Sequence, residues 1–241
     1  MKTMRKILSM ALLAFLTLGV AQAQTAESIA RKYTDAIGGA ANWKALKSVK
    51  QSIVLNTQGI DISGTVVVDA SNRTRVDMTA MGTKIVQAHD GTTAWWINPF
   101  GGATQPTKMP AAEGKEFLAE EFLDKMIDWK KRGSTLTLLG EQTVSDRDCY
   151  KLKLVTKDQV ETLYFIDKET SLLTMTRATS NAQGFKQTVE SYYSDYAKEG
   201  NVMIAKKVTT KIGGVVARTT TVNSTEFNVA TSDDMFAFPG N

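Results

Sequence analysis

The sequence predicts an α+β domain in which one large antiparallel sheet contains most of the residues. After Ser48, apolar and polar residues alternate with the period of two that is typical of strands. Turn-forming residues interrupt these runs at short, even intervals, which favours hairpins between neighbouring strands. Helical spacing of apolar residues is confined to residues 26–37, a short turn near Trp43 and Leu46, and residues 113–132. We therefore expect a meandering sheet with a few helices packed against it.

The first 23 residues have the pattern of a cleaved secretory signal. Lys2, Arg5 and Lys6 precede an uncharged apolar run over residues 7–20, and Ala21-Gln22-Ala23 supplies a small-x-small cleavage site. The apolar run is shorter than the roughly 20 residues that cross a bilayer as a helix. No Cys follows the cleavage site. We expect residues 24–241 to form a single domain that is exported to the periplasm without a lipid anchor.

The composition argues against several function classes. The 29 Lys and Arg stand against 25 Asp and Glu, and loss of the signal nearly balances the charge, which gives no support for nucleic-acid binding. The single Cys149 cannot form an intramolecular disulfide and is expected to be a small buried residue. His89 is the only histidine, which excludes metal sites with two imidazoles. We expect His89 to lie at the surface or to cap the adjoining turn.

Neither a nucleophile elbow nor a phosphate-binding loop is found in the sequence. We therefore assign no catalytic residue, no metal ligand and no cofactor, and expect a protein that is not an enzyme.

The first helix is predicted by Ile29, Tyr33 and Ile37, which share one helical face. Thr25 can cap its start, and Gly38-Gly39 can end it.

The strands are predicted from alternation and from their bounding turns. Asp90-Gly91 is predicted to be a type I′ hairpin turn. Three of the four prolines lie between residues 98 and 114, where we expect a long irregular loop. The expected strands are 51–56, 60–70, 73–80, 84–89, 93–98, 135–140, 150–156, 161–167, 172–179, 185–196, 202–212 and 215–227.

Residues 113–132 are predicted to form an amphipathic helix inserted between strands. Its apolar residues recur at intervals of three and four, and its acidic residues form a separate stripe with interleaved lysines. Such a stripe is typical of a solvated helix face, and we assign it no catalytic role. The apolar members are Phe117, Leu118, Phe122, Met126 and Trp129.

Four segments together resemble a known family. Residues 89–100 contain Asp90-Gly91, Trp95 and Asn98-Pro99, in the order D-G-x-x-x-W-x-x-N-P-x. This segment is similar to one in periplasmic lipoprotein-sorting carriers, the LolA-like family. Residues 64–78 resemble the preceding strand pair of that family, residues 164–170 resemble its Y-x-I-D-x-x-T hairpin, and residues 235–239 resemble its terminal F-x-x-P strand. The resemblance spans most of the chain after the signal.

The resemblance implies a large antiparallel sheet curled into an unclosed half-barrel, with helices as a lid on the concave face. Residues 26–37 and 113–132 are the candidates for that lid. One feature of the proteobacterial carriers is missing: Ala70-Ser71-Asn72 replaces the segment in which an Arg helps to hold the lid closed. Arg73 and Arg75 lie nearby, but the role is not carried over to them.

On this reading, apolar side chains line a cavity for a lipid or for the acyl chain of a lipoprotein. Strand alternation and the lid together select the expected lining, although either Trp95 or Trp96 could point inward. Envelope membrane proteins would donate or accept the cargo, and we expect a monomer. The alternative is a non-enzymatic envelope interaction module with a solid core and no lipid ligand. The expected lining residues are Val66, Val68, Val76, Met78, Trp96, Phe117, Phe122, Met126, Trp129, Tyr164 and Ile166.

Overall fold

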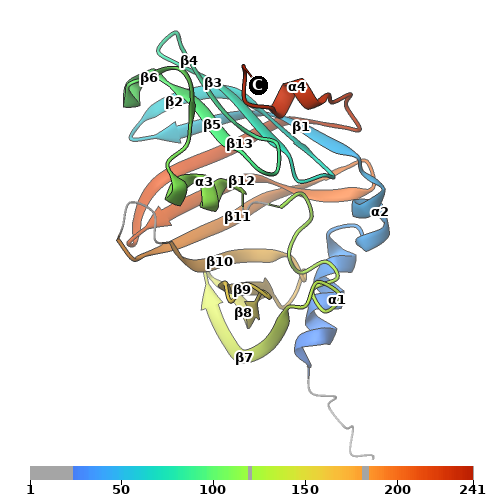
Figure 1. Ribbon diagram of the computed structural model, residues 1–241. Helices are drawn as coiled ribbons and strands as arrows, with labels where there is room; N and C mark the ends of the chain where they lie inside the picture. Colours follow the sequence, from blue (N-terminus) through green and yellow to red (C-terminus); the bar gives the residue numbers. More distant parts are fainter. Residues whose placement is uncertain (1–23, 119–120, 181–184, 241) are drawn as a thin grey trace, which may run out of the picture.

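A single antiparallel sheet dominates the computed structural model, which describes residues 24–118, 121–180 and 185–240 (Figure 1). The predicted signal lies outside the described residues. The strand order is β6-β5-β4-β3-β2-β1-β13-β12-β11-β10-β9-β8-β7. The strands are β1 Ser48–Thr57, β2 Ile60–Asp69, β3 Thr74–Ala80, β4 Thr83–His89, β5 Ala94–Asn98, β6 Ala103–Lys108, β7 Thr135–Val144, β8 Arg147–Val155, β9 Glu161–Asp167, β10 Leu173–Ser180, β11 Gln187–Glu199, β12 Val202–Ile212 and β13 Val215–Phe227.

The topology is a meander with one long-range pairing. Successive strands pair as hairpins within β1–β6 and within β7–β13, and β1 pairs with β13 to join the two halves. The outer strands β6 and β7 have free edges, so the sheet is not closed. Strand twist curls so wide a sheet, and Figure 1 shows the resulting half-barrel. The predicted fold class, with its unclosed sheet and few helices, is confirmed.

In the described residues, four short α-helices and one 3-10 helix accompany the sheet: α1 Ala26–Ala36, α2 Ala40–Ala45, α3 Ala111–Leu118, α4 Asp233–Phe236 and η1 Pro99–Gly101. Thr25 caps α1 as predicted, because its hydroxyl accepts from the Ser28 backbone N–H while the Ser28 hydroxyl accepts from that of Thr25. Gly38 and Gly39 follow the helix with φ of 108° and 85°, a region that favours glycine.

The predicted helix over residues 113–132 is wrong over residues 121–132. Of this segment, α3 contains only the first residues, and residues 121–133 form a series of turns. Asp128 has a φ of 54°, which a right-handed helix cannot accommodate. The Asp124 carboxylate accepts from the Met126 backbone N–H at 2.7 Å and stabilises a turn instead. The apolar residues of this segment have helical spacing, but they pack from turns onto the concave face of the sheet.

Three further expectations are corrected. The predicted loop after Asn98 contains β6, in which Pro106 is tolerated because an edge strand leaves amide positions unpaired. The expected terminal strand is α4 followed by a turn. Asp90 lacks the positive φ of a type I′ turn, and its carboxylate accepts from the backbone N–H groups of Thr92 and Thr93.

The sheet buries apolar side chains on both faces. On the concave face, α1 and residues 121–133 cover β7–β10, while on the convex face Cys149 packs with Phe165 and Met175. Cys149 is fully buried, as predicted. The buried core of the concave face consists of Ile29, Ala30, Tyr33, Ile37, Met126, Ile127, Leu152, Leu154, Tyr164, Ile166 and Leu173.

Candidate functional site

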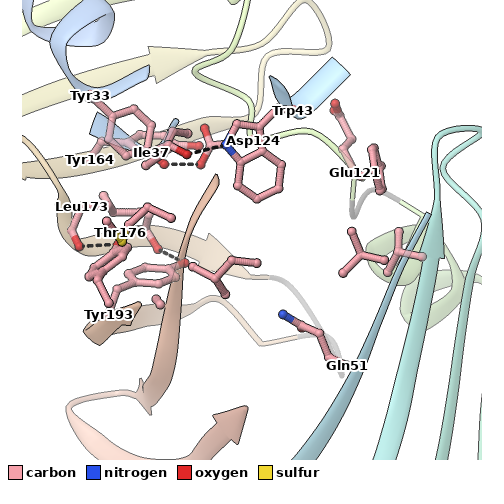
Figure 2. Close-up of a pocket in the computed structure, with 17 residues that line it drawn as sticks. Tyr33, Ile37, Trp43, Gln51, Glu121, Asp124, Tyr164, Leu173, Thr176 and Tyr193 are labelled. Atoms are coloured by element: carbon pink, nitrogen blue, oxygen red, sulfur yellow. Dashed lines mark hydrogen bonds between the residues drawn. The ribbon is translucent and has the colours of Figure 1, made fainter. Parts of the chain in front are cut away.

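A cavity of about 340 Å³ lies on the concave face where the two halves of the sheet meet (Figure 2). Strands β1 and β2 form one wall, strands β9 to β12 form the other, and α1, α2 and residues 121–124 contribute the remainder. The lining residues are Tyr33, Ile37, Trp43, Val49, Gln51, Val68, Glu121, Phe122, Asp124, Tyr164, Leu173, Thr176, Tyr193, Tyr196, Met203, Ile204 and Ala205.

Side-chain hydroxyls and one carboxylate gather on one side of this cavity. The Tyr33 hydroxyl donates to the Asp124 carboxylate at 2.7 Å, and the Tyr196 hydroxyl donates to the Leu173 carbonyl at 2.9 Å. Thr176 and Tyr193 share a hydrogen bond at 3.4 Å (Figure 2). The cavity therefore combines an apolar wall with a set of fixed polar groups, a combination typical of small-molecule sites.

Burial governs the ionisation of these groups. It raises the pKa of the Asp124 carboxyl, although the hydrogen bonds from Tyr33 and from the Met126 N–H partly oppose that rise. Burial, together with the nearby Asp124 charge, raises the pKa of Tyr33 well above its usual value. Burial also raises the pKa values of Tyr164 and Tyr196. The tyrosines are therefore neutral hydrogen-bonding groups at neutral pH.

Six of the eleven predicted lining residues lie at the cavity or in the core beside it. Val68, Phe122 and Tyr164 line the cavity itself. Met126 and Ile166 are buried in the adjoining core instead, and the half-buried Trp129 packs against that core. Met126, Ile166 and Trp129 are therefore packing residues next to the cavity.

Three other predicted residues continue the concave face away from the cavity. Val66 lies two residues from the cavity-lining Val68 on β2 and pairs with Val76 of β3. Met78 follows on the same face of β3. All three are half-buried, so they extend the apolar surface without lining the cavity itself.

The register of β4 and β5 settles which tryptophan faces inward. Trp96 pairs with Gln87, whose partner in β3 is the concave-face residue Val76. Trp95 points to the convex face, where its indole N–H donates to the Phe236 carbonyl at 2.9 Å. Trp96 is therefore the concave-face residue, although it does not line the cavity.

Phe117 of α3 is separated from the cavity and contacts His89 at the end of β4. The two rings meet edge to face with centroids 4.9 Å apart. His89 is fully buried, which corrects the surface alternative, and its Nδ1 accepts from the Gly91 backbone N–H, as the turn-capping alternative requires. Burial lowers the pKa of His89. Because β4 and β8 lie near opposite edges of the sheet, His89 and Cys149 are not brought together.

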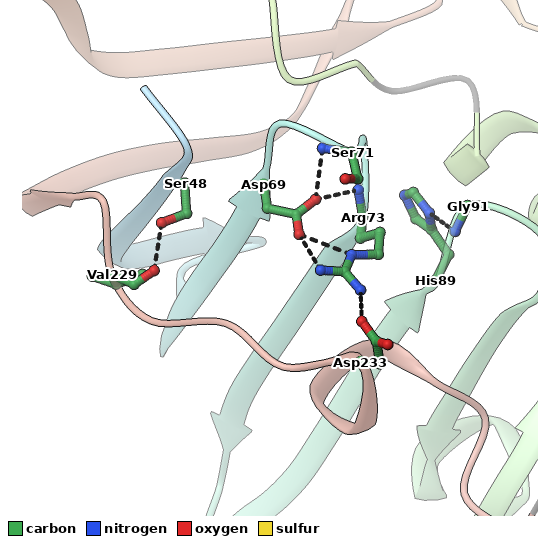
Figure 3. Close-up of polar contacts among 8 residues, drawn as sticks. All are labelled: Ser48, Asp69, Ser71, Arg73, His89, Gly91, Val229 and Asp233. Atoms are coloured by element: carbon green, nitrogen blue, oxygen red, sulfur yellow. Dashed lines mark hydrogen bonds and ion pairs between the residues drawn. The ribbon is translucent and has the colours of Figure 1, made fainter. Parts of the chain in front are cut away.

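Arg73 fixes the chain end to the convex side rather than reaching the cavity. Its guanidinium forms an ion pair with the buried Asp69 carboxylate at 2.6 Å and another with Asp233 of α4 (Figure 3). Asn72 makes the contact between this turn and residues 121–133, since its side-chain oxygen accepts from the Phe122 backbone N–H at 3.0 Å. Neither Arg73 nor Arg75 lines the cavity, and Arg75 pairs instead with Asp77.

Sequence reasoning missed most of the polar lining. The sequence marks Tyr33 only as part of a helix face, and it marks Asp124 only as part of the acidic stripe that we interpret as a solvated helix face, whereas the structure places both at the cavity. The only signal of Tyr193 and Tyr196 in the sequence is the clustering of aromatic residues in β11, which is equally typical of an ordinary strand.

Within the described residues, no group of three or more His, Cys, Asp or Glu is arranged to hold a metal ion. In the same part of the chain, every helix is too short or too polar to cross a bilayer.

No protein-family model matches the chain, and no curated protein matches it in sequence. Solved structures are similar in fold. An outer membrane lipoprotein-sorting protein domain from Vibrio parahaemolyticus has a TM-score of 0.57 at 9% identity, covering 88% of this chain and 95% of that one. A LolA superfamily protein from Nitrosomonas europaea has a TM-score of 0.58 at 15% identity, covering 89% and 98%.

A DUF1329 family protein from Desulfovibrio piger has a TM-score of 0.58 at 12% identity, with coverage of 89% and 98%. At such identities the similarity concerns the fold and not the ligand. The open antiparallel sheet, its concave-face cavity and these matches together show that the chain has a LolA-like fold.

Proposed function

We propose that this protein is a periplasmic carrier or binding protein for a lipid or for the acyl chain of a lipoprotein. The observation that carries the proposal is the cavity of about 340 Å³ on the concave face, bounded by apolar strands and by residues 121–124. A solid-core interaction module has no need of such a cavity. The proposal includes cleavage of residues 1–23, a single domain over residues 24–241, a monomeric state, and envelope membrane proteins as cargo donors or acceptors.

The size and chemistry of the cavity suit the end of an acyl chain. Its volume falls within the range of small-molecule sites, roughly 300–1,000 Å³. Each buried methylene contributes about 0.8 kcal/mol, so full burial of a chain of about 16 carbons would contribute on the order of 12 kcal/mol before the cost of ordering, and burial of its end alone contributes proportionally less. Val66, Val76 and Met78 extend the apolar surface beyond the cavity, where the rest of a longer chain can lie. No catalytic group or cofactor is needed for this binding.

The polar side of the cavity limits how the cargo is held. Tyr33 and Asp124 are already hydrogen-bonded to each other, as are Thr176 and Tyr193. These pairs satisfy one another without a ligand, so dispersion and dehydration along the apolar wall provide the main attraction. We therefore expect weak discrimination between chains of similar length.

The first test is native mass spectrometry of the processed protein purified from its own periplasm, followed by organic extraction of bound molecules. A phospholipid, fatty acid or acylated peptide at stoichiometric ratio supports the carrier. A delipidated protein that also rejects a panel of lipids favours the interaction module.

A matched pair of variants locates the binding. Val68→Trp places a large ring in the cavity without changing its polarity and is expected to weaken lipid binding by at least about tenfold. Thr221→Trp adds the same ring at an exposed position of β13, paired with Lys207 on the convex face, and is expected to bind as the wild type does. Circular dichroism checks that both variants fold. Equal lipid affinity of the folded Val68→Trp protein and the wild type would place the ligand elsewhere.

A further inference from the structure

Exposed large apolar side chains gather at one end of the sheet. Consecutive hairpins turn at alternate ends, so the turns β1–β2, β3–β4, β5–β6 and β12–β13 and the residues just before β11 share one end, and the β8–β9 turn with the exposed Val160 follows at the same end of the sheet. The first four turns lie at the left in Figure 1. Each carries at least one exposed apolar side chain in the described residues. We call this set the apolar rim: Ile60, Met81, Phe100, Phe185, Ile212, Val215 and Val216.

Single exposed apolar residues are normal on any protein, so the distribution is what needs an explanation. Met81 is 82% exposed, Val215 72% and Phe100 61%, and each lies at the tip of a different hairpin. These hairpins are neighbours in the strand order, so separate exposed side chains follow one another along the sheet end, from one hairpin to the next. None of the exposed large apolar residues identified in the described chain lies in the turns at the opposite end. A rim of this kind marks a contact surface.

The charges differ between the two ends. Exposed Lys84, Lys186 and Arg218 flank the rim, with Lys84 in an ion pair with Asp77 at 3.2 Å, and the exposed Asp61 beside the rim accepts a hydrogen bond from Asn56. The turns at the opposite end carry more carboxylates than cations: Asp90, Asp146, Asp148 and Glu169, with Asp69, Asp167 and Glu199 already ion-paired, stand beside Arg73, Arg147, Lys168 and Lys198. An anionic surface would therefore favour contact through the rim end over contact through the opposite end.

We propose that the apolar rim docks on the surface of a bilayer containing anionic phospholipid. The hairpin tips enter the headgroup region while the flanking cations contact the phosphates. Separate side chains on a curved row of hairpins fit a deformable lipid surface, whereas a protein partner needs a continuous packed patch. The rim is distinct from the cavity, whose β1 and β2 residues lie near the opposite end of those strands, so docking does not depend on the cargo proposal.

Site-specific fluorescence tests the orientation. Cys149 is fully buried, so Met81→Cys introduces an accessible thiol at the rim, and Asp146→Cys introduces one at the opposite end as the matched control. Each is labelled with an environment-sensitive dye and mixed with vesicles of equal phosphatidylcholine and phosphatidylglycerol. We expect a blue shift at position 81 and none at position 146. Equal shifts at both positions, or none at either, overturn the proposal.

Vesicle flotation tests the energetics. The variant Met81→Ser/Phe100→Ser/Val215→Ser is expected to lose at least about tenfold in association with the same vesicles. Leu139→Ser is the matched control, since Leu139 is also exposed but lies within β7, away from the rim. Association should fall with added salt and with pure phosphatidylcholine. Wild-type association by the triple variant overturns the proposal.

Two more outcomes separate this proposal from its rivals. If the dye at position 81 shifts with rising protein concentration in the absence of vesicles, the rim contacts a second copy and the proposal fails. The cavity-filling variant Val68→Trp is expected to keep its vesicle association, because the rim is unchanged. Loss of vesicle association in that folded variant would assign it to cargo uptake and overturn rim docking.

Discussion

The hydrogen bond between Tyr33 and Asp124 gives a sharp test of the polar side of the cavity. Tyr33→Phe removes the hydroxyl that donates to the Asp124 carboxylate at 2.7 Å and leaves the ring in place. Hydrogen bonds to charged groups contribute about 1.5–3 kcal/mol to stability. Because Asp124 is half-buried rather than fully enclosed, we take the lower value and expect a loss of about 1.5 kcal/mol near pH 7.

The loss of stability caused by Tyr33→Phe should depend on pH. The folded state raises the pKa of Asp124, so it binds this proton at pH values where the unfolded chain has lost it. The contribution of Asp124 to stability therefore falls as pH rises from its unfolded pKa through its folded pKa. Tyr33→Phe removes an interaction that lowers the folded pKa, so this fall becomes larger and extends to higher pH. Near pH 4, where the carboxyl is increasingly protonated, the loss should shrink to about 1 kcal/mol, the value of a neutral hydrogen bond.

The assay is urea denaturation of wild type and variant at both pH values. Tyr192→Phe is the matched control, since it removes a hydroxyl that donates to Glu190 at 3.0 Å outside the cavity, in a less buried setting. Asp124→Asn should abolish the pH dependence of the Tyr33→Phe effect. An equal cost at both pH values, or a cost no larger than that of the control, would refute the reasoning.

Two further predictions concern the contribution of Arg73 to stability and the accessibility of the Cys149 thiol. Arg73→Ala leaves the buried Asp69 carboxylate without its guanidinium and is expected to cost about 3 kcal/mol in urea denaturation and to speed proteolysis at the C-terminus. Asp233→Asn, at the 94% exposed end of the same network, should leave the stability almost unchanged, and a similar loss of stability there would contradict the assignment. Cys149 should resist thiol reagents in the folded protein and react fully in denaturant, because it is buried and burial raises its pKa. Rapid labelling without denaturant would show that the convex-face core opens.

The sequence was sufficient for most of the sheet. Alternation of period two and turn residues predicted the strands in the right order, since a meander needs only local hairpins. Thr25 and the following apolar face were enough for α1, because capping and helical spacing are local properties. The edge strand β6 escaped prediction, since prolines near an edge resemble those of a loop.

Residues 121–133 show where local patterns fail. Phe122, Met126 and Trp129 have helical spacing, yet they lie in turns that cover the concave face. The spacing of these apolar residues indicated burial of their side chains. Burial of side chains does not by itself determine whether the backbone that carries them is a helix or a series of turns. The left-handed Asp128 and the carboxylate of Asp124 determined that backbone.

Some features of the candidate site could likewise be predicted from local sequence patterns, and others could not. By itself, the sequence determined that the chain forms a large antiparallel sheet, and it supplied Val68, Phe122 and Tyr164 as apolar lining. Only the tertiary structure decided that Tyr33 from α1 and Tyr196 from β11 meet in one cavity, and that the exposed hairpin tips share one end of the sheet. The physical reason is that strand pairing and twist bring together residues far apart in the chain, and no local pattern encodes those distances.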